Sequence, residues 1–267
     1  MILTTVTDEV LDAGLEGSFA LAVQEGITHF ELRKIEGRRF PLLAEGAVQR
    51  LKQLREKFGL TFTTVSPGIF KVPLRSEEFE FHRTTLLEKT MALAEELGIN
   101  KLIVFGVKRA PSDREEDREQ VIEALGQLAL RAGQNGFTVM MENEPGFWAD
   151  YSENCLTLLE AVNRQNFRLN WDPGNLYKTG EHNYKPGYEL LKRFIANVHL
   201  KDAVTVDGKT TYLPLGEGAI DYRQLLADLR ADGYQGCLTV ETHCRPLPEA
   251  FQKSVRYLKQ LLAGMER

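Results

Sequence analysis

Cysteine is scarce in this sequence, which contains only Cys155, Cys237 and Cys244 among its 267 residues. The three are scattered and odd in number, so no disulfide framework is predicted, and a reducing cytoplasm is the expected location. The N-terminal stretch "MILTTVTDEVLDAG" has no basic segment, and no later segment approaches the roughly 18 uninterrupted apolar residues of a membrane span. We therefore expect neither a secretion signal nor a membrane anchor.

An excess of positive charge is also missing. Asp and Glu number 38 against 33 Lys and Arg, and the formal net charge is -5. This argues against nonspecific binding of nucleic acid by a broadly basic surface, although it leaves room for a local basic groove. Linkers rich in Pro, Gly or Ser are absent as well. Residues 1–267 are therefore predicted to form one domain, and α/β barrels commonly take about 250 residues.

Short strand-like runs alternate strictly with longer helical patterns. The predicted strands are 2–7, 28–33, 60–66, 101–107, 137–143, 167–172, 196–202 and 237–242. The predicted helices are 15–25, 43–58, 77–98, 114–135, 151–164, 185–194, 221–232 and 246–264. Strict alternation favours a parallel sheet, and eight strand–helix pairs favour a closed (β/α)8 TIM barrel over an open sheet.

The stretch "RLNWDPGN" (168–175) points to a functional site, because its apolar strand ends on the carboxylate of Asp172. An isolated buried charge is unfavourable unless another group pairs with it. Side chains alternate between the two faces of a strand, and this alternation also directs Glu142, His199 and Glu241 inward near their strand ends. The carboxyl ends of barrel strands form the active-site mouth, so we expect these four side chains in one ring.

Three carboxylates that converge without a counter-charge would repel one another, and a divalent cation would remove the repulsion. Three carboxylates and one imidazole form an oxygen-rich set that suits Mn²⁺ and could also hold Co²⁺, Mg²⁺, Fe²⁺ or Zn²⁺. We therefore predict one divalent metal ion. One open alternative is that Glu144, which shares the parity of Glu142, is the ligand instead. Another is that nearby cations neutralise the carboxylates without metal, the candidates being Arg33, Lys201 and Arg245.

Further polar groups are predicted at the same mouth. Glu31 and Arg33 share the inward face of their strand, where they either steer substrate hydroxyls or form a structural ion pair inside the barrel. Lys201 lies two residues beyond His199 on the same face. It is expected to contact a substrate oxygen or to hold a metal-ligating carboxylate. His243 is also inward by parity and is expected above the plane of the metal.

The stretch "LPLGEGAID" follows the seventh predicted strand, in a region where barrels of this class often bind phosphate. Gly216 and Gly218 could present backbone N–H groups to an anion, but Glu217 between them argues against it. We favour a turn that leads into a helix capped by Asp221. Weak candidates for binding a phosphorylated substrate are the loop cations Lys71, Lys108, Arg109 and Arg245.

At this point the sequence resembles the xylose-isomerase-like TIM-barrel superfamily, of the sugar phosphate isomerase and epimerase type. The resemblance covers nearly the whole chain, and the motifs that carry it are "MMENEPG", "NWDPGN", "VHLKDA", "PLGEGAIDY" and "GYQGCLTVETH". It implies metal ligands at Glu142, Asp172, His199 and Glu241. In the epimerases of this superfamily the first and last of these carboxylates also act as the acid–base pair.

The resemblance implies isomerisation or epimerisation of a small sugar, keto-sugar or sugar phosphate through a metal-bound cis-enediolate. Glu142 and Glu241 would then be the catalytic residues. The predicted substrate-binding residues are Glu31, Arg33, Asn175 and Lys201. Asn175 stands where several relatives carry a histidine. The expected partner is a small carbohydrate, with no membrane or nucleic acid, and relatives are often homo-oligomers.

Three other functions stay open. An inosose-type dehydratase would use the same metal site and begin with a similar proton removal. A DNA-repair enzyme of the endonuclease IV type needs extra histidines for three zinc ions, whereas this sequence has five histidines in all and none in the loops after its third and fourth strands. A non-catalytic sugar-binding barrel is the last alternative.

Overall fold

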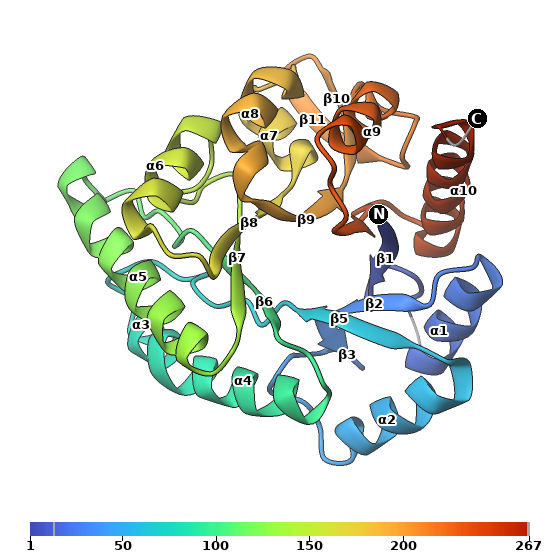
Figure 1. The fold of residues 1–267 in the computed structure, drawn as a ribbon, viewed down its shortest axis with the longest axis horizontal. Helices are drawn as coiled ribbons and strands as arrows, with labels where there is room; N and C mark the ends of the chain where they lie inside the picture. The colour runs from blue at the N-terminus through green and yellow to red at the C-terminus, as the bar shows by residue number, and fades with distance from the viewer. Residues whose placement is uncertain (13, 266–267) are drawn as a thin grey trace.

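Eight parallel strands close into a barrel at the centre of the molecule (Figure 1). The computed structural model describes residues 1–12 and 14–265. The barrel strands are β1 (Ile2–Val6), β2 (His29–Leu32), β5 (Thr61–Val65), β6 (Lys101–Phe105), β7 (Thr138–Glu142), β8 (Phe167–Trp171), β9 (Ile195–Leu200) and β12 (Cys237–Val240). Their order around the barrel is β1-β12-β9-β8-β7-β6-β5-β2, and β1 closes it by pairing with both β12 and β2.

This architecture confirms the predicted (β/α)8 barrel, and each barrel strand begins and ends within two residues of its predicted bounds. The helices that surround the barrel are α1 (Leu15–Gln24), α2 (Ala47–Phe58), α4 (Leu87–Glu96), α5 (Arg118–Gln134), α6 (Ser152–Val162), α8 (Tyr184–Leu191), α9 (Tyr222–Ala231) and α10 (Leu247–Met265). None of the helices in the described part of the chain combines the length and the apolar character needed to cross a membrane.

The outward faces of the strands pack against these helices. Phe30 of β2 meets Phe19 of α1 edge-on, with ring centroids 4.7 Å apart. Trp171 of β8 packs against Tyr188 of α8, with ring centroids 5.4 Å apart. Burying one such side chain contributes about 1.5–3 kcal/mol. The alternation that turns these residues outward leaves the polar residues of the same strands facing the barrel interior.

Two β-hairpins stand outside the barrel and were not predicted. The first joins β3 (Lys34–Ile35) to β4 (Arg38–Arg39), and the second joins β10 (Asp202–Val206) to β11 (Lys209–Leu213). Each has a two-residue turn with positive φ at both positions, Glu36-Gly37 and Asp207-Gly208. Such turns match the twist of paired strands. Because the hairpins follow β2 and β9, they add side chains to the carboxyl-terminal mouth.

Two helical segments also differ from the prediction. The expected helix 77–98 is divided into α3 (Glu78–Phe81), a π-helical turn (His82–Leu86) and α4. At the division, Nδ1 of His82 accepts a hydrogen bond from the backbone N–H of Phe70 at 3.0 Å. A short helix, α7 (Pro173–Thr179), begins directly after Asp172. This last helix matters for the site, since Asp172 is its N-cap.

Candidate metal centre and active site

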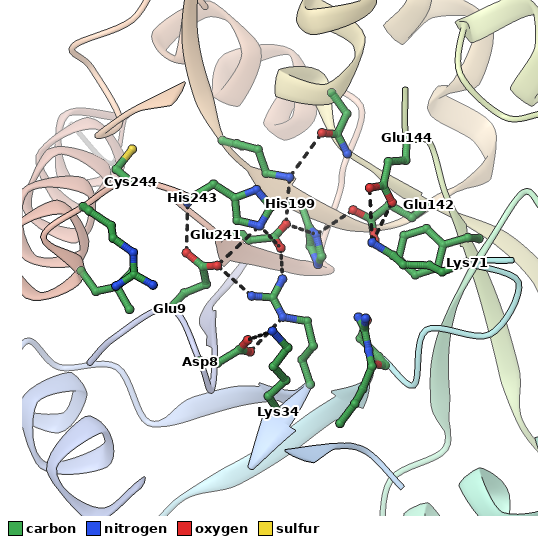
Figure 2. Close-up of a pocket in the computed structure, with 18 residues that line it drawn as sticks. Asp8, Glu9, Lys34, Lys71, Glu142, Glu144, His199, Glu241, His243 and Cys244 are labelled. Atoms are coloured by element: carbon green, nitrogen blue, oxygen red, sulfur yellow. Dashed lines mark hydrogen bonds and ion pairs between the residues drawn. The ribbon is translucent and has the colours of Figure 1, made fainter. Parts of the chain in front are cut away.

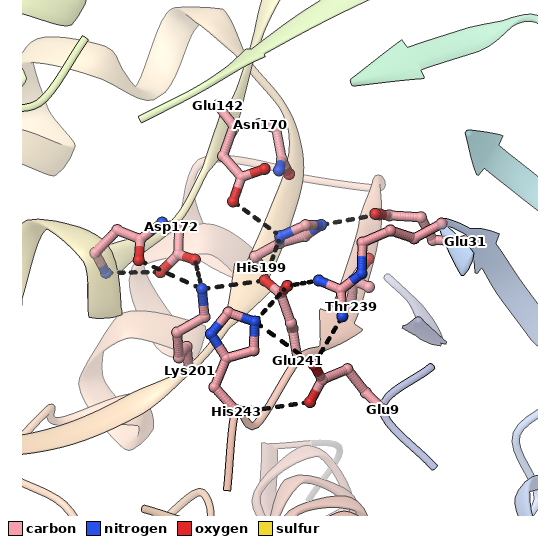
Figure 3. A network of polar contacts seen from close by, with 12 residues as sticks. Glu9, Glu31, Glu142, Asn170, Asp172, His199, Lys201, Thr239, Glu241 and His243 are labelled. Carbon is pink, nitrogen blue, oxygen red and sulfur yellow. Dashed lines mark hydrogen bonds and ion pairs between the residues drawn. The ribbon is translucent and has the colours of Figure 1, made fainter. Parts of the chain in front are cut away.

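The four predicted ligand side chains come together at the carboxyl-terminal mouth (Figure 3). Glu142 ends β7, Asp172 directly follows β8, His199 lies in β9, and Glu241 directly follows β12. Each offers one ligand atom, and these atoms all lie within 4.8 Å of one another. All four residues are at most 4% exposed. The cluster forms because neighbouring parallel strands place their last inward residues side by side.

The carboxylate of Asp172 divides its two oxygens between two tasks. Oδ1 accepts a hydrogen bond of 2.8 Å from the backbone N–H of Asn175 and so caps α7, which has Pro173 at its first turn. Oδ2 faces the cluster, 2.9 Å from Nζ of Lys201. The Asn143 side chain bonds both backbone groups of Asp172, at 2.7 and 2.8 Å. The buried carboxylate is therefore a helix cap whose second oxygen faces the site beside Lys201.

The imidazole of His199 is held between carboxylates. Nε2 lies 2.8 Å from Oε2 of Glu31, while Nδ1 lies 2.9 Å from Glu241 and 3.4 Å from Glu142 (Figure 3). Nδ1 is therefore the nitrogen that faces the cluster. Burial lowers the pKa of His199, but the carboxylates of Glu31, Glu142 and Glu241 outweigh it and raise the pKa well above its usual value.

Two cations neutralise part of the carboxylate charge. Lys201 is 2% exposed, and its Nζ lies 2.9 Å from Asp172 and 3.1 Å from Glu241. Arg33 forms an ion pair with Glu241 from the opposite side. Burial raises the pKa of Glu241, but Lys201, His243 and Arg33 lower it well below its usual value. For Asp172, burial outweighs Lys201 and raises the pKa.

A divalent cation fits the buried ligand atoms that make no oriented hydrogen bond. Oδ2 of Asp172, Nδ1 of His199 and Oε2 of Glu241 are buried and make no properly oriented hydrogen bond with any described residue. Each such group costs about 1–3 kcal/mol when it stays unsatisfied. The donor set of carboxylate oxygens and one imidazole nitrogen suits Mn²⁺ and its divalent neighbours. Lys201 and Arg33 do neutralise charge, as the alternative expected, and Lys201 lies within ion-pair distance of Oδ2 of Asp172 and Oε2 of Glu241. Nδ1 of His199 has no cation beside it among the described residues and faces only carboxylates. Arg245 does not take part, because it pairs with Asp12.

Glu142, and not Glu144, lies in the cluster of candidate ligands, because Glu144 pairs with a neighbouring lysine. Lys71 lies 2.9 Å from Oε2 of Glu144 and 3.9 Å from the ring centroid of Phe105 (Figure 2). Glu144 therefore belongs to the wall of the cavity, away from the ligand atoms, and Glu142 faces His199.

A cavity of about 380 Å³ opens above the cluster (Figure 2). Of the predicted substrate-binding residues, Arg33, Asn175 and Lys201 line it, but Glu31 does not. Glu31 is 1% exposed and lies behind His199. The structural ion pair between Glu31 and Arg33, one of the two alternatives for these residues, does not form among the described residues. Arg33 instead pairs with Asp8 at 2.8 Å, Glu9 at 2.7 Å and Glu241.

Sequence reasoning missed several lining residues. Glu9 comes from the loop after β1 and lies 3.5 Å from Nε2 of His243, which is itself 3.0 Å from Glu241. Arg39 comes from the unpredicted hairpin, and Ser66 and Phe105 complete the same side. The clearest missed signal is the "TDE" run directly after β1, where a carboxylate follows a buried strand much as Asp172 does.

In the loop "LPLGEGAID", the backbone N–H groups of Gly216 and Gly218 are engaged by Asp202 and do not face an open anion site. This buried carboxylate accepts hydrogen bonds from Gly216, Gly218 and Ile220 at 2.9–3.2 Å. Asp221 caps α9 by accepting from Gln224, as predicted. Among the loop cations considered for a phosphorylated substrate, Lys108 and Arg109 are not part of the cavity lining that the described residues form.

Comparison with known proteins gives a consistent picture. The model of the xylose isomerase-like TIM barrel family matches residues 19–261. A 3-dehydroshikimate dehydratase from Bacillus anthracis is 20% identical over 183 residues, which cover 60% of this chain and 65% of that protein. An inosose dehydratase from Geobacillus thermodenitrificans is 26% identical over 193 residues, 64% of each chain. The match thus spans slightly less than two thirds of either relative.

A solved structure of a D-allulose 3-epimerase from Methylomonas sp., in complex with D-allulose, is similar in fold with a TM-score of 0.78. It is 17% identical, and the alignment covers 97% of this chain and 96% of that one. At this identity the likeness concerns the fold alone.

Proposed function

The chain belongs to the xylose isomerase-like TIM barrel family, and on that premise we propose a divalent-metal-dependent isomerase or epimerase of a small sugar, keto-sugar or sugar phosphate. The observation that carries the proposal is the buried ring of Glu142, Asp172, His199 and Glu241, in which three ligand atoms lack hydrogen-bond partners. The ring lies at the floor of a cavity sized for a small molecule.

The four side chains of the ring would hold one metal ion, with Mn²⁺ the best match to the donor set. When bound, the ion would act as a Lewis acid on adjacent oxygens of a hydroxy-ketone and so acidify a neighbouring C–H bond. Its ligands converge from separate strands, which fixes their positions before substrate arrives.

Glu142 and Glu241 are the proposed proton carriers. The cations around Glu241 lower its pKa, so it is ionised at neutral pH and available to accept a proton. Return of a proton by the other glutamate to the opposite face of the same carbon gives an epimer. Return to the neighbouring carbon exchanges aldose and ketose. General acid–base catalysis of this kind contributes about 10²–10⁴-fold.

The cavity wall supplies hydrogen bonds that orient the substrate. Nζ of Lys201 lies 3.3 Å from Oδ1 of Asn175, and the hydroxyl of Tyr212 lies 3.2 Å from the same oxygen. These three groups form a polar corner beside Asp172. Arg33 lies on the other side of Glu241, so a polyhydroxylated substrate would find donors on both sides of the proposed proton carrier.

A dehydratase is the second candidate, and the relatives that match in sequence favour it, since both are named as dehydratases. It would share the first proton removal and then expel a β-hydroxyl group.

The three free, buried cysteines agree with work in a reducing cytoplasm.

Incubation of the metal-loaded protein with a panel of ketoses, cyclic ketones and ketose phosphates in D₂O tests both candidates. An isomerase or epimerase incorporates deuterium at the reacting carbon, which NMR detects. A dehydratase yields a product that has lost one water, which mass spectrometry detects. If folded, metal-loaded protein gives neither product with any member of the panel, the proposal is wrong and a binding protein becomes the better account.

A further inference from the structure

Arg39 differs from every other cation that lines the cavity. Five of the lining cations have a carboxylate within 4.0 Å, namely Arg33, Lys34, Lys71, Lys201 and Arg245. Arg39 has no carboxylate within that distance among residues 1–12 and 14–265. The contrast with Arg33 is sharpest, because that guanidinium is surrounded by three carboxylates.

The guanidinium of Arg39 is held in a defined position. Arg39 ends β4, and its Nε donates to the backbone oxygen of Ser66 at 3.3 Å. The group lies against Gly68, where a Cβ would come within 2.9 Å of Nε and 3.1 Å of Nη1. Gly68 also has a φ of 79°, which a side chain would strain. The loop after β5 thus holds the guanidinium in place, and its two terminal nitrogens make no hydrogen bond with residues 1–12 or 14–265.

This arrangement leaves a partly buried guanidinium with no carboxylate within 4.0 Å in the described part of the chain. Burial and the nearby charge of Arg33 lower the pKa of Arg39 and outweigh the more distant Asp8, Glu142 and Glu144, although the guanidinium stays protonated. Six lysines and arginines line the cavity against five carboxylates. Asp172 lies beneath the wall, and Arg245 already has Asp12 as its partner outside the lining. An anion beside Arg39 would compensate the charge of its guanidinium.

We propose that Arg39 binds an anionic group of the substrate, a carboxylate or a phosphate, through the paired N–H groups of its guanidinium. Resting on the proposed function, this makes the substrate a sugar acid or a sugar phosphate rather than a neutral sugar. The planar fork of arginine matches two oxygens of either group. The anion would lie at the edge of the cavity formed by β4 and the loop after β5, while the reacting carbon lies over Glu142 and Glu241.

Calorimetric titration of the Mg²⁺-loaded protein with glycerol 3-phosphate, glycerate and glycerol tests the site without requiring turnover. We expect at least one of the two anions to bind and glycerol not to bind detectably. Glycerol 3-phosphate and glycerate separate phosphate from carboxylate recognition. Arg39→Gln should weaken the bound anion by about tenfold or more, because a charge-assisted pair is lost. Arg50→Gln is the matched control, an exposed arginine of α2 that pairs with Glu16 away from the cavity, and it should change affinity less than about twofold.

Arg39→Lys provides a second variant that keeps the charge but loses the planar fork, and it carries the test if Arg39→Gln does not fold. It should bind the anion about threefold or more weakly than the parent. Equal affinity of parent and Arg39 variants for both anions would overturn the inference, as would failure of the folded, Mg²⁺-loaded parent to bind either anion.

The result is separable from the proposed reaction. Anion binding that depends on Arg39, with no deuterium exchange on any ketose, would leave the site in place and remove the isomerase proposal. Deuterium exchange on neutral ketoses, with the same kcat/KM in the parent and in Arg39→Gln, would support the isomerase proposal and remove the anion site at Arg39.

Discussion

Nε2 of His199 lies 2.8 Å from Oε2 of Glu31, and both side chains are almost completely buried. With this nitrogen engaged, the ring presents Nδ1 to Glu142, Asp172 and Glu241. A carboxylate behind a metal-binding histidine fixes the orientation of the ring and raises its basicity. We therefore propose that Glu31 is a positioning residue, whose effect would reach the site through the imidazole of His199.

Substitution Glu31→Gln should weaken Mn²⁺ binding by about 10–100-fold, since the amide can accept a hydrogen bond but carries no charge. Isothermal titration of metal-free protein measures the affinity. Glu144→Gln serves as the control, because Glu144 lies at the same cavity but pairs with Lys71. Unchanged Mn²⁺ affinity in folded Glu31→Gln would show that the Glu31–His199 contact has only a structural role.

Metal addition should stabilise the fold. Protein purified without chelator should contain about one divalent ion per chain, and removal of the ion should lower Tm. Return of Mn²⁺ at about 100 times its Kd should contribute about 2.7 kcal/mol, which corresponds to roughly 5 °C or more in Tm. Asp172→Asn should lose most of this shift. A Tm that does not respond to Mn²⁺, Co²⁺, Mg²⁺, Fe²⁺ or Zn²⁺ would contradict the metal site.

Replacement of Glu241 by Gln should lower the rate of substrate deuterium exchange by about 10²–10⁴-fold, because the amide cannot take up the proton. The fold should persist, as circular dichroism would check, since the side chain keeps its size. Single-turnover measurements with saturating metal distinguish slower chemistry from weaker metal binding. Exchange at nearly the parental rate would remove Glu241 from the proposed acid–base pair.

The approach of α7 to β9 leaves no room for a side chain at Gly174. A Cβ there would lie 2.1 Å from the backbone oxygen of Lys201 and 2.8 Å from its Cβ. We expect Gly174→Ala to destabilise the protein by about 1–3 kcal/mol in urea denaturation. It should also weaken metal binding, because it displaces the helix capped by Asp172.

Gly126 in α5 provides the matched control, since a Cβ at this position would meet no atom within 4 Å. Gly126→Ala should stabilise the protein by up to about 1 kcal/mol through helix propensity alone. If both alanine variants change stability equally, the close contact at Gly174 is not the cause.

The sequence was sufficient to predict the barrel and the cluster because both depend on short-range alternation. A barrel strand can be recognised from its own residues when its outward face is apolar and its inward face is polar near the carboxyl-terminal end, as in β7, β8 and β9. Neighbouring strands then bring Glu142, Asp172 and His199 together without any further information.

Contacts across the barrel could not be predicted in the same way. Glu31 and Arg33 share a parity and both face the interior, but parity does not say which residues from other strands and loops each side chain meets. The side chain of Arg33 turns toward Asp8 and Glu9, and Glu31 meets His199 from across the barrel. The hairpin turn at Asp207-Gly208 is different, because Asp-Gly is a strong local signal for such a turn and could have been recognised.

The two hairpins lie apart from the residues proposed to carry out the reaction. The proposed proton carriers and metal donors lie in the barrel strands or directly after them, whereas Arg39 and Tyr212 lie in the hairpins outside the barrel. If the two proposals hold, replacing a hairpin would change which compound is bound and keep the proposed metal donors and proton carriers in place. A laboratory seeking new substrates for this scaffold would therefore randomise residues 34–39 and 202–213, sparing Asp202 that ties the second hairpin to its neighbouring loop.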